Sequence, residues 1–381
     1  MFGRDLFLPD PSGLYTVLAV VVANRRPGKP VWLVQVGAPS SGKTVNLDAL
    51  DLLAEVHQVT TMTQAALLPA CSPKAKPDGV LDRIGVGGEG LMVCKDLTVA
   101  LKNHADERAE TDVFDLLRVV YDGETDRRLG TFGGQHRHWH GKVGFIAACT
   151  EIIDRHAERL GSLGERFIYQ RPAAVDRDAM RAWVVEHDVA IDDDEARRHR
   201  AATAKVFLDS LDLRATVTVD AFDRDLLMRL ADLATRARSA VWRDGSSDTI
   251  SLVPDPEMPM RVYKVFRQLF EAFRILSLDR DATWQQVGAL ALDAIAKARR
   301  LPLVHLLNRH SWQRMGDIAS ALNLPISAVV RPLEELAAHG VVEREGRGGG
   351  DVMWRAAGWA AETWALLPEQ TRRVAKAGTL V

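Results

Sequence analysis

The sequence is poor in cysteine, in net charge and in long hydrophobic runs. Its three cysteines, Cys71, Cys94 and Cys149, are far apart and follow no metal-ligand spacing, and their odd number argues against a disulfide framework. A formal net charge of −2 excludes a globally basic polyanion binder, so any contact with nucleic acid must be local. The apolar run at residues 14–23 is shorter than the ~18 residues that span a bilayer, and no basic segment precedes it. We therefore expect a cytoplasmic protein that makes no contact with a membrane.

The length and composition indicate a folded protein of more than one domain. At 381 residues the chain should form two or three domains of roughly 100–200 residues each. Hydrophobic residues make up 47% of the chain and charged residues 26%, which is enough apolar surface for a sizeable core.

The stretch VWLVQVGAPSSGKTVNL, residues 31–47, fits the pattern G-x-x-x-x-G-K-[ST]. In this pattern backbone N–H groups turn toward phosphate oxygens, the lysine neutralises the β- and γ-phosphates, and the threonine hydroxyl reaches Mg²⁺. The apolar residues before the glycines predict a buried strand and residues 45–56 predict a helix, so strand, loop and helix occur in the required order. We therefore expect ATP and Mg²⁺ as ligands. The expected nucleotide contacts in this loop are Gly37, Pro39, Ser40, Ser41, Gly42, Lys43 and Thr44.

A phosphate loop needs a second strand that ends in an acidic residue able to hold Mg²⁺ and water. Residues 90–94 form an apolar run, and Asp96 is the first carboxylate after it. Such strands usually end in two adjacent acidic residues, whereas Lys95 precedes Asp96 here, so Glu89 and Asp82 are weaker alternatives. Asp96 is thus expected to act in catalysis and to share Mg²⁺ with the loop threonine.

Further along the chain, KVGFIAAC at residues 142–149 predicts another buried strand. It ends at Thr150, whose polar side chain would point toward the γ-phosphate. Arg166 follows shortly after, in the sequence GERF.

This order of parts resembles the AAA+ ATPases, and among them the minichromosome-maintenance-like helicases and the related ATPases of phages and mobile elements. The resemblance covers roughly residues 15–300 and implies an α/β fold with a three-layer αβα core. It implies that Thr150 occupies the first-sensor position, where the family usually has Asn, and that Arg166 is an arginine finger acting on the neighbouring subunit. It also implies that Arg261 is the second-sensor arginine, unless this residue is a solvent-facing arginine near a helix start. A finger that acts in trans implies a homo-oligomeric ring, and we expect a hexamer.

The resemblance and the helical periodicity together predict four segments. These are a nucleotide-binding core at 1–175, a helical lid at 176–300, a winged helix-turn-helix at 301–358 and a helical tail at 359–381. The third segment reads as two helices, a strand, a glycine-rich loop and a strand, in which the second helix would enter the DNA major groove. The expected DNA contacts of this segment are Arg331, Arg344 and Arg347, although Glu334 and Glu335 give the second helix a mixed charge, and winged helices also serve protein contacts.

Between the acidic strand and the next strand lies a basic, glycine-interrupted insert that predicts a hairpin. In the resembled family such a hairpin points into the central pore, so it offers contacts to the phosphate backbone through Arg127, Arg128, Arg137 and Lys142. The alternative is an ordinary solvated loop. Within the same insert His136, His138 and His140 alternate and would share one face of a strand, but no fourth metal ligand is evident, so we interpret them as polar hairpin residues.

The functional expectation is an ATPase, a helicase-like DNA translocase or remodeller in phage or mobile-element replication, with DNA and replication proteins as partners. One alternative is an ATP-switched initiator or helicase loader that does not unwind DNA. Another is a winged-helix transcription regulator whose oligomerisation is gated by ATP.

Overall fold

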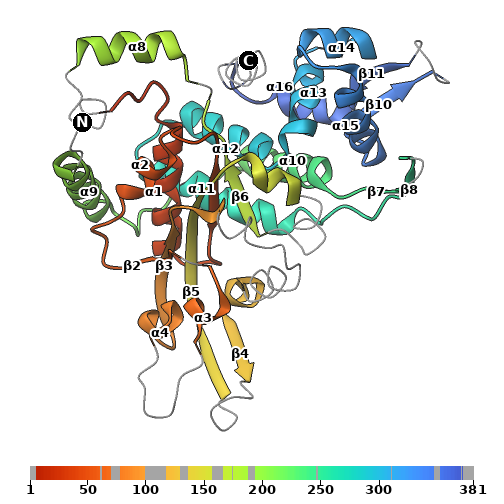
Figure 1. Ribbon diagram of the computed structural model, residues 1–381. Helices are drawn as coiled ribbons and strands as arrows, with labels where there is room; N and C mark the ends of the chain where they lie inside the picture. Colours follow the sequence, from red (N-terminus) through yellow and green to blue (C-terminus); the bar gives the residue numbers. More distant parts are fainter. Residues whose placement is uncertain are drawn as a thin grey trace. The chain divides into compact units, whose positions relative to one another are not determined.

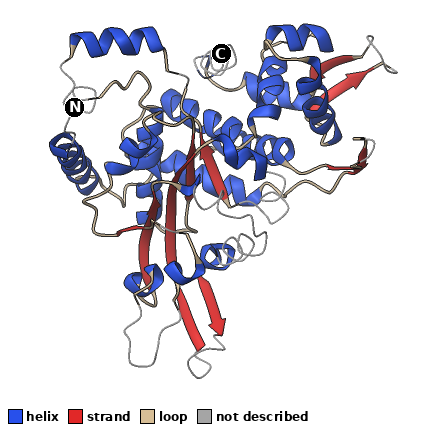
Figure 2. Cartoon of the chain, viewed as in Figure 1, coloured by secondary structure: helices blue, strands red, loops and turns tan. Residues whose placement is uncertain are grey.

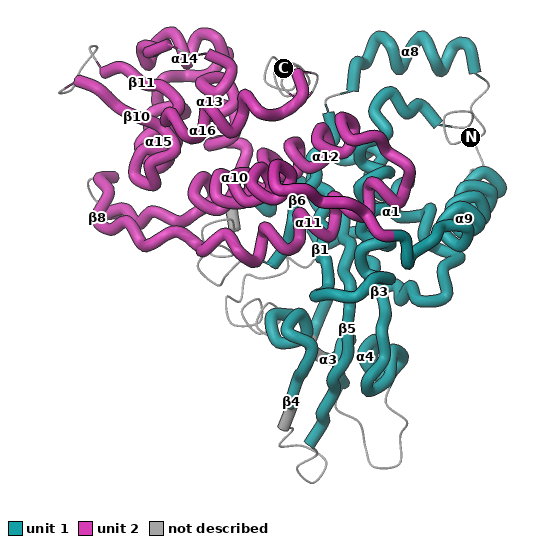
Figure 3. Tube along the Cα trace, turned by 180° about the vertical axis from the view of Figure 1, so that it is seen from behind, with its two compact units in different colours: residues 1–153, 166–215 teal, residues 154–165, 216–381 magenta. Residues whose placement is uncertain are grey.

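The structure is a computed structural model, and it divides the chain into two compact units. Unit 1 comprises residues 1–153 and 166–215, and unit 2 comprises residues 154–165 and 216–381 (Figure 3). The expected boundaries at residues 175, 300 and 358 stay predictions. The residues described by the structure are 6–60, 62–69, 78–98, 117–128, 136–156, 166–173, 175–187, 194–245, 248–309, 311–346, 352–369 and 371.

Unit 1 contains a central parallel sheet, which confirms the expected mixed α/β class. Its strand order is β2-β3-β5-β1-β6, and β4 pairs antiparallel with the first part of β5 (Figure 1). Every residue of β1 is buried, as expected for a parallel strand covered on both faces. The strands are β1 (Trp32–Val36), β2 (Val56–Gln58), β3 (Gly88–Cys94), β4 (Glu124–Arg128), β5 (His136–Cys149) and β6 (Phe167–Gln170).

Helices accompany this sheet, and α1 packs against β1 and β5. Ten of the eleven residues from Gly13 to Ala23 are buried, Tyr15 being the exception, which explains the apolar sequence of this helix. None of the helices within the described ranges has the length and apolar character needed to cross a membrane. The helices of this unit are α1 (Ser12–Arg25), α2 (Lys43–Asp48), α3 (Gln64–Leu67), α4 (Val80–Ile84), α8 (Arg177–Glu186) and α9 (Asp194–Asp209), and the 3₁₀ helix η2 (Glu151–His156) follows β5.

The helix expected over residues 45–56 is shorter than predicted. Regular α-helix ends at Asp48, and the chain continues through i→i+3 bonds such as Leu50 N–H to Leu47 C=O at 3.0 Å and Leu53 N–H to Leu50 C=O at 3.0 Å. These tighter turns lead directly into β2, where the chain must reverse to join the sheet.

An aromatic cluster surrounds the first residue of β1. Trp32 begins β1 and pairs in register with Phe145 of β5 and Phe167 of β6. The Trp32 ring lies 5.5 Å from the ring of Phe145 and 5.2 Å from that of Tyr121, and its indole N–H donates to the Val143 carbonyl at 2.7 Å. This packing, with the indole N–H satisfied, fixes the register of β1 against its neighbours.

Unit 2 is predominantly helical, and Figure 2 shows helices with only short strands there. The periodic segments at 221–238 and 260–275 form the expected helices, whose buried faces pack together. Between them lies a two-stranded ribbon that periodicity did not predict, because each strand has only two or three residues. The elements are α10 (Ala221–Arg238), β7 (Trp242–Arg243), β8 (Ile250–Leu252), α11 (Met260–Ile275) and α12 (Arg280–Asp293).

The last part of unit 2 combines helices with a three-stranded antiparallel sheet in the order β10-β11-β9. The helix α13 packs on α15 and on β11. The elements are α13 (Lys297–Leu307), β9 (Gln313–Arg314), α14 (Met315–Ala321), α15 (Ile326–Ala338), β10 (Val342–Glu345), β11 (Met353–Ala356) and α16 (Gly358–Ala365).

Candidate functional site

The glycine-rich loop leaves the carboxyl end of β1 and turns tightly into α2. Gly37 donates its N–H to the Cys149 carbonyl at 3.1 Å, and a Cβ at Gly37 would lie 2.9 Å from the Ser41 Oγ, so a larger residue would displace the Ser41 side chain. Gly42 has a φ of 81°, and Ser40 has a φ of 60°, which is uncommon for a residue other than glycine. Left-handed residues of this kind turn successive N–H groups toward one side, which suits an anion.

Lys43 is the first residue of α2, and its ammonium group folds back over the loop. It donates to the Gly37 carbonyl at 2.9 Å, the Ala38 carbonyl at 2.6 Å and the Ser41 Oγ at 3.1 Å. The residue is 8% exposed. Burial lowers the pKa of the Lys43 ammonium, while Cys149 and Asp96 act in the opposite direction. A cation is thus held directly above the loop, at hydrogen-bonding distance from groups that a phosphate oxygen could replace.

Two further strand ends lie beside the loop, because β3, β5 and β1 are adjacent and parallel. Cys94 of β3 pairs with Ala147 of β5, so Asp96 and Thr150 emerge at the same edge of the sheet as the loop. Thr98 links them: its N–H donates to the Asp96 carboxylate at 2.9 Å, and its Oγ1 accepts the Thr150 N–H at 3.1 Å. The sequence patterns predicted Asp96 and Thr150 as site residues. They did not indicate Thr98, because its role depends on this contact between two strand ends.

The lysine that interrupts the acidic strand end is engaged elsewhere. Lys95 donates to Asp48 at 2.7 Å and to Asp51 at 2.9 Å, and Arg197 of α9 pairs with the same Asp51 at 2.6 Å. Lys95 therefore has two carboxylate partners other than Asp96. Its position in the sequence does not make it a neutralising partner of Asp96.

The two weaker carboxylate candidates lie away from this edge. Glu89 is the second residue of β3, five positions before Cys94, which at about 3.3 Å per residue corresponds to about 17 Å. Asp82 belongs to α4 and pairs with Arg137. The structure therefore favours Asp96 over Glu89 and Asp82 as the carboxylate beside the loop.

The described cysteines of this region are inert structural residues. Cys94 and Cys149 are buried free thiols, and burial raises the pKa of each to about 11. A buried thiol with a raised pKa carries little thiolate at neutral pH. Cys71 lies outside the described residues.

The expected arginine finger contacts its own chain in this structure. Arg166 immediately precedes β6 and pairs with the Asp122 carboxylate at 3.2 Å, while its guanidinium lies 5.5 Å from the centre of the Tyr121 ring. The side chain is 10% exposed. Arg261 belongs to unit 2, where it pairs with Glu257 at 3.6 Å. The roles of Arg166 and Arg261 toward a nucleotide stay predictions.

The sequence analysis expected the basic side chains of the hairpin to be available for phosphate contacts, but two of them make contacts within the chain. Arg137 is paired with Asp82, and its side chain is 17% exposed. Lys142 is half-buried and donates to the carbonyls of Asn24 at 2.8 Å and Arg26 at 2.5 Å, and burial lowers the pKa of its ammonium group. Lys142 lies beyond the hairpin, where β5 pairs with β3, whereas Arg137 lies near the turn and is paired there with Asp82 of α4. Arg127 and Arg128 lie on β4, and their side chains are outside the described residues.

The predicted DNA contacts of the C-terminal region are partly described. Arg331 on α15 is exposed and pairs with Glu335 at 3.0 Å and with Asp248 at 3.7 Å. Arg344 on β10 is exposed and lies 5.5 Å from the centre of the Trp354 ring. Arg347 lies outside the described residues.

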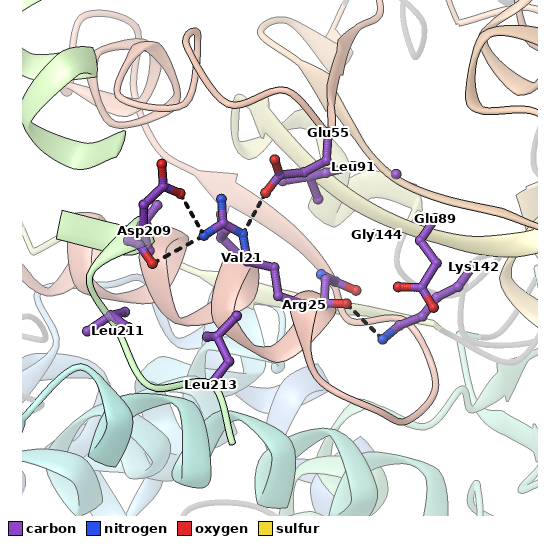
Figure 4. Close-up of a pocket in the computed structure, with 13 residues that line it drawn as sticks. Val21, Arg25, Glu55, Glu89, Leu91, Lys142, Gly144, Asp209, Leu211 and Leu213 are labelled. Carbon is purple, nitrogen blue, oxygen red and sulfur yellow. Dashed lines mark hydrogen bonds and ion pairs between the residues drawn. The ribbon is translucent and has the colours of Figure 1, made fainter. Parts of the chain in front are cut away.

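A cavity of about 510 Å³ lies within unit 1, beside the first half of β3 and the middle of β5 (Figure 4). Arg25 projects into this cavity and pairs with Glu55 at 2.6 Å and with Asp209 at 3.5 Å. Lys142 and Glu89 line another part of its wall. Arg25 is paired with the two other carboxylates of the wall, and Lys142 donates to backbone carbonyls. Sequence patterns did not indicate this cavity.

Comparisons with known proteins add little to this geometry. No protein-family model matches the sequence, and no curated protein matches it. A solved structure described as "The A form apo structure of NrS-1 C terminal region-CTR" aligns with 11% sequence identity and a TM-score of 0.29, covering 94% of this chain and 74% of that one. A similarity of this size assigns neither fold nor function.

Proposed function

We propose that this chain is an ATP-hydrolysing ring motor of the AAA+ type that translocates on or remodels DNA in the replication of a phage or mobile element. The observation that carries the proposal is the convergence of the Lys43 loop, Asp96 and Thr150 at one edge of a parallel sheet. Ligands of open α/β sheets bind outside the carboxyl ends of the strands, and this is such an edge.

Each part of this edge has a role in the proposal. Backbone N–H groups of residues 37–44 and the Lys43 ammonium hold the β- and γ-phosphates of ATP. The Thr44 hydroxyl and the Asp96 carboxylate are hard oxygen ligands, the type that Mg²⁺ prefers. Bound Mg²⁺ would neutralise charge on the phosphates. Thr150, positioned by Thr98, offers a hydroxyl to the γ-phosphate or to the attacking water.

The strand order supports the AAA+ assignment. A first-sensor side chain must lie between the phosphate loop and the acidic strand end in order to contact the γ-phosphate. The order β3-β5-β1 brings the end of β5, and with it Thr150, between those two elements. The hydrogen bond from Gly37 N–H to the Cys149 carbonyl joins the loop to the same strand end.

The C-terminal elements support a DNA-binding role. The succession α13, β9, α14, α15, β10 and β11 is the order of a winged helix-turn-helix, in which α15 would be the recognition helix. Ile326 and Arg331 are exposed on α15. Glu335 is 5% exposed and pairs with Arg299 at 2.8 Å, so it adds less negative charge to the surface than the sequence suggested.

The ring and the replication context come from the resemblance of the sequence to AAA+ ATPases. In the proposal Arg166 leaves Asp122 when subunits assemble and acts on the γ-phosphate of the neighbouring subunit. The Asp122 carboxylate of this pair is 62% accessible, so solvent can replace Arg166 as its partner.

The proposal is tested by ATP hydrolysis in the full-length protein. Lys43→Ala should abolish ATP binding, and Asp96→Asn should suppress hydrolysis more than binding, since its charge serves Mg²⁺ or water rather than the adenine. Lys29→Ala is a matched control, because Lys29 is an exposed lysine of the same unit that contacts the Asp122 carbonyl at 3.3 Å. Hydrolysis at the wild-type rate in the Lys43 variant would show that this loop is not the nucleotide site.

Strand displacement on a forked DNA substrate then separates the motor from the two alternatives. An ATP-dependent unwinding activity that Lys43→Ala abolishes supports the motor. ATP-dependent DNA binding without unwinding would instead favour an initiator or loader. Binding restricted to one operator sequence would favour a transcription regulator.

A further inference from the structure

The hairpin formed by β4 and β5 gathers carboxylates and imidazoles from two strands on one face. In the antiparallel register Glu124 lies opposite His140, and Asp126 lies opposite His138. His136 is two positions before His138, so it shares the same face of β5. Figure 1 shows β4 beside the first part of β5, extending beyond the rest of the sheet.

The side chains on this face already lie close together. The Asp126 carboxylate is 3.0 Å from His138 Nδ1 and 3.0 Å from His136 Nε2. Together with Glu124, Asp126 and His138 place one ligand atom each within 4.8 Å of one another. These three residues are exposed, so an ion from solvent can reach them.

We propose that this face of the hairpin binds a zinc ion through Glu124, Asp126 and His138, with His136 or water completing the shell. Zinc prefers tetrahedral sites of imidazole and carboxylate ligands at about 2.0–2.2 Å, which separates neighbouring ligand atoms by about 3.4 Å. The separations of 3.0 Å between Asp126 and the two imidazoles are shorter than that value, and a small side-chain movement would remove the difference.

The composition of the face favours a metal site over an ordinary surface ion pair. An ion pair needs one carboxylate and one cation, whereas this face carries two carboxylates and three imidazoles, with Arg128 opposite His136. An exposed ion pair contributes about 0–1 kcal/mol to stability, so ion pairing alone does not account for five such residues on one face. In the part of the chain that the structure describes, this is the one group of three metal-ligating residues whose donor atoms converge in this way.

The sequence could not identify this site, because its ligands come from both strands. The three histidines alone supply one type of ligand from one strand, and the carboxylates lie at residues 124 and 126, before the turn of the hairpin. Bound zinc would join β4 to β5 through side chains as well as through the backbone ladder.

The test is zinc titration of untagged, chelator-treated, full-length protein by calorimetry without nucleotide. Wild-type protein should bind one zinc ion per hairpin, and Co²⁺ in its place should give the visible absorption of a tetrahedral site. Asp126→Asn and His138→Asn should each weaken binding by at least about tenfold, since even partners of metal ligands cost 10–100-fold when removed. These residues are exposed, so circular dichroism should show the variants folded.

Two control variants make the result specific. His187→Asn removes an exposed histidine that stacks on Trp183 at 4.4 Å, and it should leave zinc affinity unchanged. Asp96→Asn alters the proposed Mg²⁺ site and should also leave it unchanged. The proposal is overturned if wild-type protein binds no zinc, if the Asp126 and His138 variants bind as wild type does, or if binding is lost with Asp96 instead. None of these results depends on ATP hydrolysis, so the proposed function stands or fails separately.

Discussion

Replacing the carboxylate of Glu335 should strongly destabilise the C-terminal part of unit 2. Glu335 is 5% exposed and accepts from Arg299 at 2.8 Å, from Arg243 at 3.2 Å and from Arg331 at 3.0 Å. Arg299 is itself 7% exposed, so Glu335→Gln leaves a buried guanidinium without its charge partner. Removing one partner of a buried ion pair costs about 3–5 kcal/mol.

The surroundings place the expected loss near the lower end of that range. Arg299 keeps hydrogen bonds to the carbonyls of Ala237 at 3.2 Å and Ser239 at 2.6 Å, and Arg243 keeps Glu334 at 3.1 Å. We expect about 3 kcal/mol, which corresponds to about a hundredfold in the unfolding equilibrium. Glu334→Gln is the matched control, because Glu334 contacts Arg243 but is 31% exposed, and it should cost less than about 1 kcal/mol.

Hydrogen exchange followed by mass spectrometry measures this effect separately from unit 1. Peptides from α13 and α15 should exchange about a hundredfold faster in Glu335→Gln and nearly as in wild type in Glu334→Gln. Equal exchange in the two variants would refute the reasoning, because it would mean that the buried carboxylate contributes no more than an exposed one.

Three further predictions concern other residues. The Arg166→Ala protein should still bind ATP but should lose most of its ATP hydrolysis. Mixing Arg166→Ala subunits with Lys43→Ala subunits should restore part of the ATPase activity. If the mixture forms mixed oligomers but stays inactive, Arg166 is not a finger that acts in trans. Burial lowers the pKa of His339 in the folded protein. As pH falls below about 6.5, His339 is therefore protonated more readily in the unfolded state than in the folded state, and the free energy of unfolding decreases. His339→Gln should reduce that pH dependence, measured by thermal unfolding at pH 7.5 and 5.5. Arg331→Ala should weaken DNA binding and reduce its salt dependence by about one counterion, measured by fluorescence anisotropy, whereas an unchanged salt slope would exclude a phosphate contact by Arg331.

Local sequence was sufficient to identify the parallel sheet and the residues at its strand ends. The strand before Gly37 and the strand before Thr150 are continuous apolar runs, which are typical of parallel strands buried on both faces. Because parallel strands share one direction, residues that follow them must meet at one edge. The position of Asp96 beside the loop is therefore a consequence of local patterns and topology.

The partners of individual charged side chains could not be predicted in the same way. Arg137 pairs with Asp82, which is 55 positions away in the sequence, and Lys142 donates to the carbonyl of Asn24, which is 118 positions away. A basic residue in a hairpin has the same sequence signature whether it pairs internally or faces solvent. The difference depends on tertiary contacts that no short window contains.

The length of β5 has a mechanical consequence. The strand has 14 residues, about 46 Å at about 3.3 Å per residue, and it runs without interruption from the hairpin to Thr150. Its second half is hydrogen-bonded to β3 on one side and to β1 on the other. A pull on the hairpin along β5 therefore loads both ladders in shear, so that their hydrogen bonds must yield together rather than one after another. Tension applied at the hairpin would therefore reach the edge of the sheet that holds Lys43 and Asp96.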